Sequence, residues 1–446
     1  MRGIFSFLLA VIFVCFNFAT PALAFCGFYV AKADAKLYNQ ASQVAIARDG
    51  NRTILTMAND YQGQPQDFAL VVPVPTLLKK EQVRIGDPKI MQRLDSFSAP
   101  RLVEYFDQNP CEPVMLYRME RNNLPAVTSA DRAGKAEALG VKIEEQFSVG
   151  EYDILILSAK ESNGLETWLS QNGYRLPQGA AELLQPYIRQ ELKFFVAKVN
   201  LKELAQSKIQ KLRPLMIAYE SARFMLPIRL GMTNSKGSQD LLVYLLSPKG
   251  QVELVNYRTA KIPTDQEIPV YVKDNFSEFY RAMFQNSHRK AGKNLAFLEY
   301  AWDMGNCDPC AAEPLSPTEL RQAGVFWLDD LGESPTRRRG FLPTSNVFIT
   351  RLHIRYDRAT FPEDLQFKET ANRQLFQGRY ILRHPYRGKI TCAADITYRR
   401  QVRDRQEREA ENLAQLTGWN LQDIRRKSNI TENKVNNQPF WRRFWR

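Results

Sequence analysis

The chain opens with a run of apolar residues bounded by polar and small ones. Arg2 gives a positive charge, residues 4–16 follow with Ser6 as their only polar side chain, and Pro21 to Ala24 close the stretch. A short basic start, an apolar core and a small-x-small end are typical of a secretory signal peptide. The pattern predicts a protein exported to the periplasm or the extracellular space, with cleavage after Ala24.

Two other interpretations of this run fit its residues less well. A retained membrane anchor needs about 20 apolar residues, whereas this core is shorter and is followed by a cleavage signal. A lipoprotein needs a small residue before its modified cysteine, whereas bulky Phe25 precedes Cys26. No later apolar run approaches the length of a membrane-spanning helix, so we expect a mature chain without a transmembrane helix.

Short β-rich runs predict strands in the next part of the chain. Residues 44–47 and 53–57 flank Asp49-Gly50, and an Asp-Gly pair between such runs favours a β-hairpin. Residues 68–72 predict a third strand. We expect it to end at Pro73, because proline cannot donate a hydrogen bond to a ladder.

Hydrophobic spacing further along predicts a mixture of helices and strands. Helices are expected at residues 89–106 with a break at Pro100, 164–170, 178–189, 275–284 and 401–416. Strands are expected at residues 143–147, 152–157, 192–199, 215–219, 224–230, 241–246, 252–257, 295–302, 347–356 and 378–384. The two types do not alternate regularly, so the pattern indicates an α+β fold with mixed, largely antiparallel sheets and several helices.

The length of the chain predicts more than one compact unit. Its 446 residues exceed the usual size of a single core, so two subdomains, or one large domain with a tail, are expected. We assign residues 1–24 to the signal peptide, 25–200 to an N-terminal α+β subdomain and 201–398 to a C-terminal β-rich subdomain. Residues 399–446 complete the chain as a charged helix and a disordered basic-aromatic tail.

The chain is basic, with a formal net charge of +13 in an otherwise ordinary globular composition. Residues from 399 onward carry twelve Lys and Arg against six Asp and Glu, and residues 440–446 mix rings with arginines. Such a mixture suits a lipid headgroup boundary. The expected partners are an envelope polymer, an anionic membrane surface or another envelope protein, and nucleic acid is not expected. A role in solubility alone is the simpler interpretation of the charge.

Cysteine usage also follows from the expected export. Cys15 lies in the signal peptide, and an oxidising compartment favours disulfides among the remaining cysteines. Five cysteines allow at most two bridges, and the sequence leaves fifteen pairing schemes open. The cysteines of the mature chain are Cys26, Cys111, Cys307, Cys310 and Cys392.

The Cys307-x-x-Cys310 motif admits three interpretations. A redox pair is favoured when the first cysteine begins a helix, but Pro314 limits any helix here to about one turn. A zinc site needs two more ligands, and none of the three histidines belongs to a second paired motif. A structural disulfide is therefore preferred. Cys111 is a nucleophile only if a histidine base reaches it, and a disulfide is its commoner fate after export.

A basic strand provides the other candidate site. Side chains alternate along a strand, so Arg351, His353 and Arg355 share one face, and Arg383 and His384 lie in a similar basic strand. If these strands pair, they form a surface suited to a carboxylate or a phosphate. The alternative is a solvated basic row. No Gly-rich phosphate loop, nucleophile elbow or His-Glu-x-x-His motif is present, so no cofactor or metal is expected.

Several strings of residues resemble one bacterial family, the proteins grouped as domain of unknown function 2330. They are Phe25 to Ala33, Thr56 to Asp60, Phe68 to Pro75, Ser98 to Leu102, Leu226 to Leu230 and Cys307 to Cys310. The resemblance extends from Phe25 to about Tyr398. It implies an export signal; some members also carry a C-terminal membrane helix, from which this polar C-terminus departs. It implies no reaction and no catalytic residues.

The residues together favour an exported cell-envelope protein that works as a non-enzymatic binding or structural module stabilised by disulfides. The competing hypothesis is an envelope thiol-disulfide oxidoreductase that uses Cys307 and Cys310.

Overall fold

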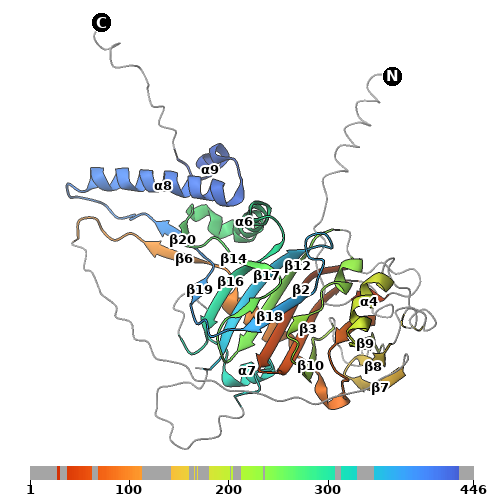
Figure 1. The fold of residues 1–446 in the computed structure, drawn as a ribbon. Helices are drawn as coiled ribbons and strands as arrows, with labels where there is room; N and C mark the ends of the chain where they lie inside the picture. Colours follow the sequence, from red (N-terminus) through yellow and green to blue (C-terminus); the bar gives the residue numbers. More distant parts are fainter. Residues whose placement is uncertain are drawn as a thin grey trace, which may run out of the picture. The chain divides into compact units, whose positions relative to one another are not determined.

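The computed structural model describes most of the chain between Phe28 and Ile430 (Figure 1). Contacts group the chain into two compact units. Unit 1 comprises residues within 1–99, 125–261 and 292–377, and unit 2 comprises residues within 100–124, 262–291 and 378–446. The described residues are 28–30, 38–62, 69–112, 142–159, 165, 168, 180–200, 202–203, 212–234, 237–306, 313–328 and 346–430.

A mixed sheet of nine strands is the largest element of unit 1. Its order is β14-β16-β17-β12-β2-β3-β10-β5, with β19 also paired to β16. β2 pairs with β12, and β14 with β16, in parallel, while the other neighbours run antiparallel. The strands are β2 (Tyr38–Asp49), β3 (Arg52–Gln62), β5 (Val83–Ile85), β10 (Leu215–Glu220), β12 (Gln239–Ser247), β14 (Arg258–Lys261), β16 (Leu295–Asp303), β17 (Phe348–Tyr356) and β19 (Phe376–Gln377).

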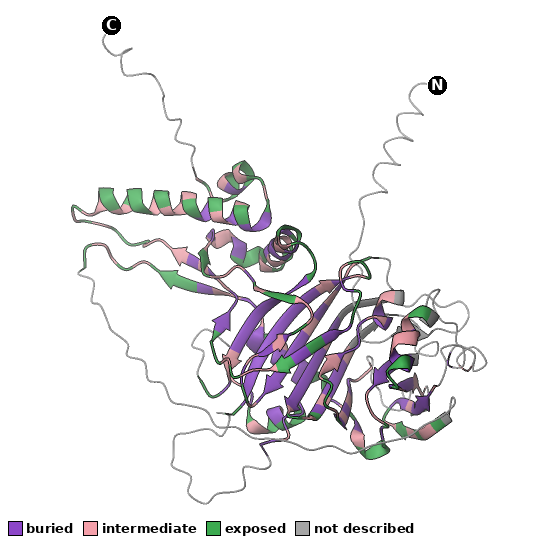
Figure 2. Ribbon diagram, in the orientation of Figure 1, coloured by how far each residue is buried: buried purple, intermediate pink, exposed green. Residues whose placement is uncertain are grey.

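This sheet agrees with the strand pattern of the sequence and extends it. β2 and β3 form the predicted hairpin, with Gly50 at a positive φ of 56° in the turn. The sheet takes strands from both sides of residue 200, where a subdomain boundary is expected; independent folding of each side stays a prediction. Buried residues concentrate on its strands (Figure 2).

One face of the nine-stranded sheet is covered by two helices, α2 (Pro88–Ser98) and α7 (Pro317–Gln322). Asp87 caps α2, and the helix ends before Pro100 as the sequence predicts. The helix expected at residues 101–106 is wrong, because these residues form strand β6 and pair with β20. Its apolar positions are buried on the sheet, where the ring of Phe97 meets that of Tyr300 edge-on at 5.5 Å. The buried apolar residues of α2 are Ile90, Met91, Leu94 and Phe97.

A second sheet of unit 1 has the order β1-β4-β9-β8-β7 and packs against α4 (Ala180–Arg189). β4 continues through Pro73, so the expectation that it ends there is wrong. Pro73 lies opposite Phe194 of β9, and the described residues of β1 pair with Ala69 to Val71. The strands are β1 (Phe28–Val30), β4 (Ala69–Val74), β7 (Lys142–Val149), β8 (Tyr152–Ser158) and β9 (Lys193–Val199).

The strand expected at residues 224–230 is mostly absent. Only β11 (Met225–Leu226) is extended, in a small sheet with β18 (Leu365–Glu369) and β13 (Val252–Leu254), and a 3₁₀ helix follows at Leu230–Asn234. The backbone N–H groups of Ile228 and Arg229 donate to the buried carboxylate of Asp364. A side chain therefore replaces the strand partner that the pattern implied.

Unit 2 places helices against a three-stranded parallel sheet of order β15-β20-β6. The Phe279 ring on α6 meets Tyr380 of β20 edge-on at 4.8 Å, and Asn412 on α8 donates to the Glu267 carbonyl of β15. The elements are β6 (Arg101–Phe106), β15 (Gln266–Glu267), β20 (Arg379–His384), the 3₁₀ helix η4 (Val270–Asn275), α6 (Phe276–Ala291), α8 (Asp395–Thr417) and α9 (Leu421–Lys427).

The C-terminal part of unit 2 is more ordered than the sequence suggests. α8 ends at Gly418 with a φ of 76°, but α9 follows it, so disorder does not begin directly after Gly418. Asn420 caps α9 by accepting from the backbone N–H groups of Gln422 and Asp423. No helix within the described ranges is both long and apolar enough to cross a membrane. The α+β class with mostly antiparallel sheets is confirmed.

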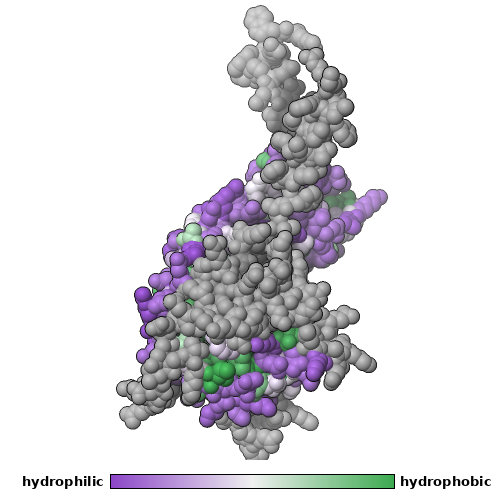
Figure 3. Space-filling view, turned by 90° about the vertical axis from the view of Figure 1, so that its right-hand side faces the viewer, coloured by the Kyte–Doolittle hydropathy of each residue, from purple (hydrophilic) through white to green (hydrophobic). Residues whose placement is uncertain are grey.

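Polar side chains dominate the described surface in the view of Figure 3, where hydrophobic side chains gather in small patches.

The two loops at one end of unit 2 are joined by a disulfide between Cys111 and Cys392, whose Cα atoms lie 5.8 Å apart. Cys111 follows β6 and Cys392 precedes α8, so the bridge links segments separated by 281 residues.

Loss of this bridge is expected to destabilise unit 2. The variant Cys111→Ser/Cys392→Ser should lower the free energy of unfolding of unit 2 by about 2–5 kcal/mol, because the unfolded chain gains the freedom that the bridge removes. Urea unfolding followed by circular dichroism measures this change. Reduced wild-type protein is the control and should unfold with the double variant; an unchanged midpoint in both would contradict the prediction.

Candidate functional site

Charged side chains form a continuous row on one face of the nine-stranded sheet. Arg351, His353 and Arg355 alternate along β17 as their spacing predicts. Arg351 and His353 are only 4% and 7% exposed, so this part of the row is buried rather than solvated. Carboxylates from three other elements lie between the cations. We call the six residues Asp95, Arg351, Glu299, His353, Asp240 and Arg355 the ion-pair row.

Charges of opposite sign alternate along the ion-pair row. Arg351 donates from Nη1 to Asp95 Oδ1 at 2.7 Å and from Nε to Glu299 Oε2 at 2.6 Å. The other oxygen of Glu299 lies 2.9 Å from His353 Nδ1. His353 Nε2 lies 3.4 Å from Asp240, which accepts two hydrogen bonds from Arg355 at 2.7 and 2.6 Å. Every cation of the row therefore has a carboxylate in contact.

A β-bulge supplies the central carboxylate. β16 pairs with β17 at Leu298 and again at Tyr300, and the register shifts between them. Glu299 is the extra residue, and its side chain is fully buried between Arg351 and His353. Bulges re-aim side chains in this way. The spacing of apolar residues in the sequence gave no sign of this bulge, so Glu299 was not predicted.

The helix α2 supplies the outer end of the row. Asp95 accepts from Arg351 and also from the hydroxyl of Tyr244 at 2.8 Å. Ser98 on the next turn lies 3.4 Å from Arg351. Ser98 is buried among the apolar residues of α2, and the sequence assigns neither Asp95 nor Ser98 a role.

The row shifts the pKa values of its members in opposite directions. Burial acts to lower the pKa of His353, but the carboxylates of Glu299 and Asp240 outweigh it, and the net shift is upward. Burial acts to raise the pKa of Asp240, but hydrogen bonds from His353 and Arg355 bring it well below its usual range. The imidazolium and the carboxylates thus stabilise one another as charged groups.

The cations of the ion-pair row are already paired within the chain, so the row is not an open binding site. An external anion would have to compete with carboxylates that already contact each cation. Anion binding by Arg351, His353 and Arg355 stays a prediction that this pairing does not favour. No group of three or more His, Cys, Asp or Glu suited to a metal occurs among the described residues.

Arg383 and His384 lie elsewhere. Their strand β20 pairs with β15 and β6 in unit 2, whereas β17 pairs with β12 and β16 in unit 1. The condition for a shared basic surface, pairing of the two strands, is therefore not met. Arg383 pairs with Glu267 at 2.8 Å, and His384 lies 2.8 Å from Glu104.

The candidate cysteines divide into two groups. Cys111 and Cys392 form the disulfide of unit 2, so neither is a free nucleophile. Cys26, Cys307 and Cys310 lie outside the described residues. The redox interpretation of Cys307 and Cys310 stays a prediction.

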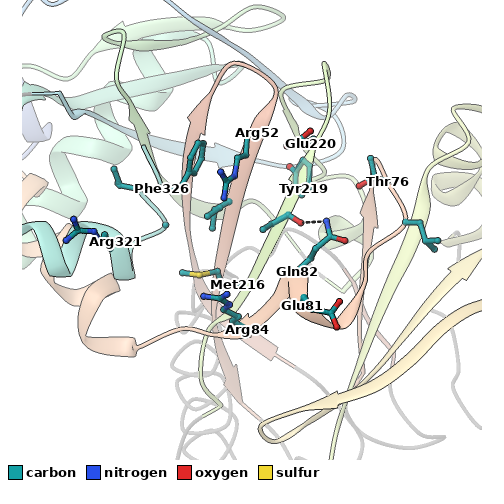
Figure 4. Close-up of a pocket in the computed structure, with 15 residues that line it drawn as sticks. Arg52, Thr76, Glu81, Gln82, Arg84, Met216, Tyr219, Glu220, Arg321 and Phe326 are labelled. Atoms are coloured by element: carbon teal, nitrogen blue, oxygen red, sulfur yellow. Dashed lines mark hydrogen bonds between the residues drawn. The ribbon is translucent and has the colours of Figure 1, made fainter. Parts of the chain in front are cut away.

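An open groove of about 700 Å³ lies over strands β3 and β10 of the nine-stranded sheet (Figure 4). Ile54, Met216 and Ala218 lie on its floor. The segment after α7 forms one wall, and residues 76–84 form the other. Sequence reasoning missed this groove because its walls come from segments distant in the chain.

Gly324 brings the first wall close to the floor. Its φ is 97°, and a Cβ atom added there would lie only 2.7 Å from the Ile54 side chain. Glycine is therefore required both by the backbone conformation and by the close approach. Phe326 follows, and the guanidinium of Arg52 lies over its ring, 4.2 Å from the centroid.

The groove has a cationic rim over an apolar floor. Met216 on β10 pairs with Arg84 of β5 on one side and with Thr56 of β3 on the other. Thr56 lies four residues beyond Arg52 on β3. Strand rise and spacing place the Cα atoms of Arg52 and Arg84 about 16 Å apart. Arg321 adds a third cation, and Glu81 and Glu220 provide two carboxylates. The buried hydroxyl of Thr76 lines the groove without a hydrogen-bond partner among the described residues.

The ion-pair row predicts a pH dependence of stability. Because the pKa of His353 is raised by folding, its contribution is complete below 6.5 and is lost as the pH rises through the higher folded-state pKa. His353→Gln should lower the free energy of unfolding by about 1–3 kcal/mol at low pH and flatten this slope. Urea unfolding on both sides of pH 6.5 tests it. Arg358→Gln is the control and should keep the wild-type slope; an equal slope in His353→Gln would refute the assignment.

Comparison with known proteins identifies one relationship. A family model described as uncharacterized protein conserved in bacteria (DUF2330) matches residues 20–368. Neither the curated proteins nor the solved structures provided a match. The match covers more than half of the sequence and agrees with the resemblance carried by its motifs. The chain belongs to the DUF2330 family of uncharacterized bacterial proteins.

Proposed function

We propose that this chain is an exported cell-envelope protein that works as a non-enzymatic binding module, with the open groove as its binding surface. The observation that carries the proposal is the combination, in one groove, of an apolar floor and a rim of three arginines. The signal-peptide pattern and the disulfide between Cys111 and Cys392 support the exported location.

The contrast between the groove and the ion-pair row supports binding rather than catalysis. In the row, Arg351, Glu299 and His353 are buried and contact one another, so substrate has no access to them. In the groove, Arg52 and Arg84 are exposed side chains of the sheet surface. The lining residues of the groove include arginines and carboxylates, which bind charged groups of a ligand through ion pairs and hydrogen bonds.

The lining indicates the chemistry of the ligand. Arginines pair with carboxylates or phosphates, and the stacking of Arg52 on Phe326 holds its guanidinium while leaving the N–H edges able to donate. Ile54, Met216 and Val325 provide apolar contact between the cations. A ligand with more than one anionic group and an apolar portion, extended along the groove, fits this arrangement.

Substitution of the rim arginines is expected to weaken binding of such a ligand. A fluorescein-labelled peptide with alternating Asp and Leu is the probe, and fluorescence anisotropy measures its dissociation constant. Arg52→Ala/Arg84→Ala should weaken binding at least tenfold, because each lost charge-assisted hydrogen bond contributes about 1.5 kcal/mol or more.

A matched control separates the groove from the overall positive charge. Arg358→Ala/Lys368→Ala removes two exposed cations of unit 1 that do not line the groove, and its affinity should stay within about twofold of wild type. Equal weakening in both double variants would mean that net charge, not the groove, binds the probe. Absence of binding by wild-type protein would contradict the proposed ligand chemistry.

Export has its own test. Expression of the full chain with a C-terminal tag in a Gram-negative host should yield a periplasmic product whose N-terminus is Phe25, because the peptidase cleaves after the small residue Ala24. Mass spectrometry of the purified product identifies its first residue. An uncleaved cytoplasmic product would contradict export, whereas Ala22→Arg/Ala24→Arg, which blocks the small-residue site, should retain the leader.

A further inference from the structure

One face of the unit 2 sheet presents charged side chains to α8. Glu267 of β15 and Arg383 of β20 share this face, because Glu267 pairs with Ile381, two residues before Arg383. Arg383 donates to Glu267 at 2.8 Å, and its guanidinium lies over the ring of Tyr105, its partner on β6. Asn412 on α8 donates to the backbone carbonyl of Glu267, so the helix lies against β15.

The helix adds Arg405 and Glu409 to this charged layer. Their spacing of four residues places them on one side of α8. Arg405 donates to the two oxygens of Asp107 at 3.2 and 2.7 Å, and its Nε lies 3.5 Å from Oε1 of Glu409. Glu409 is only 3% exposed, and this Oε1 has no hydrogen-bond partner among the described residues. The Glu409 carboxyl is thus buried beside a guanidinium that another carboxylate already binds.

The acids of this layer outnumber its cations. Asp107 is paired with Arg405 and Glu267 with Arg383, so an ionised Glu409 would be a third, uncompensated negative charge. Burial, which the two arginines offset only in part, raises the pKa of Glu409 to about 7, and the charges of Glu267 and Asp107 act in the same direction. With α8 in place, Glu409 therefore carries a proton under mildly acidic conditions.

The helices packed against α8 hold it on either side of Glu409. Arg425 of α9 pairs with Glu407, two residues before Glu409. Lys290 of α6 donates to the backbone carbonyl of Gln415, and His288 lies buried two residues before Lys290. His288 is a second ionisable group close to α8 in sequence of contacts, so a test of Glu409 has to separate the two by substitution.

We propose that Glu409 is a proton-dependent latch that holds α8 on the sheet of unit 2. The neutral acid is accommodated beneath the helix, whereas the carboxylate has no cation of its own there and is solvated only when the helix lifts. The disulfide between Cys111 and Cys392 tethers the start of α8, so we expect the lifting in the turns from Glu409 onward. The latch involves neither the ion-pair row nor the groove, and its test is independent of the proposed binding function.

The raised pKa of Glu409 sets the direction of the pH dependence. Its ordinary value of 4.5 applies when α8 is lifted, and the value of about 7 applies when the helix is seated. The stabilisation of the seated helix is therefore complete below pH 4.5 and is lost as the pH rises to about 7. Within this range the equilibrium constant for seating should fall by up to about tenfold per pH unit, and above it the dependence on Glu409 ends.

Amide hydrogen exchange of the mature full-length protein tests the latch. Mass spectrometry of peptides covering residues 406–417 reports the seating of α8 once the intrinsic pH dependence of exchange is corrected for. Wild-type protection should decrease from pH 4.5 to about 7 and then level off. Glu409→Gln, which is neutral at every pH, should keep the low-pH protection throughout. Glu411→Gln removes an exposed acid of the same helix and should keep the wild-type slope.

A second variant tests the excess of acids over cations. Glu267→Gln leaves Arg383 available to stabilise an ionised Glu409, so the loss of protection should be smaller and should end at a lower pH. A wild-type slope in Glu409→Gln would overturn the proposal and point to another group such as His288. Constant wild-type protection, or equal flattening by Glu411→Gln, would overturn it as well. Thermal unfolding and retention of the disulfide verify that each variant is folded.

Discussion

Burial of charge is the constraint on which unit 1 depends. A guanidinium, an imidazolium and a carboxylate removed from water cost several kcal/mol each unless partners meet them in the interior. Arg351, Glu299 and His353 meet this requirement only because β16 bulges by one residue and α2 approaches with Asp95. The register of the sheet and the position of the helix over it are therefore tied to the same set of contacts.

That constraint also explains why the apparent basic site is not open. A strand face with three cations reads from the sequence as a surface for anions, and the structure supplies the anions from within the chain. The same sheet is accessible in the groove, which Gly324 to Phe326 line on one side. There, the guanidinium of Arg52 lies over the ring of Phe326.

The sequence predicted those parts of the fold that depend on local patterns. The β2–β3 hairpin, the apolar stripe of α2 and the shared face of Arg351, His353 and Arg355 all follow from residue spacing. The failures come from contacts over long distances. β4 continues through Pro73, which lies opposite Phe194 of β9, and Asp364 replaces a strand partner for Ile228.

The candidate sites follow the same division. Nothing near Glu299 marks it as the carboxylate that joins Arg351 to His353, because a bulge is visible only against the partner strand. The groove is hidden for the same reason: Arg84 and Phe326 reach the floor formed by Ile54 through strand pairing and helix packing. Residue spacing could not decide among the fifteen possible cysteine pairing schemes. The parallel pairing of β6 with β20 brings Cys111 toward Cys392.

Unit 2 differs from unit 1 because its sheet is too small to stabilise the far end of the unit by itself. Three parallel strands, one of them only two residues long, bury little beyond the rings that face α6. The disulfide and the contacts of Asp107 with Tyr398 and Arg405 stabilise the far end instead. Bracing by polar and covalent links does not require an apolar core at that end of the unit.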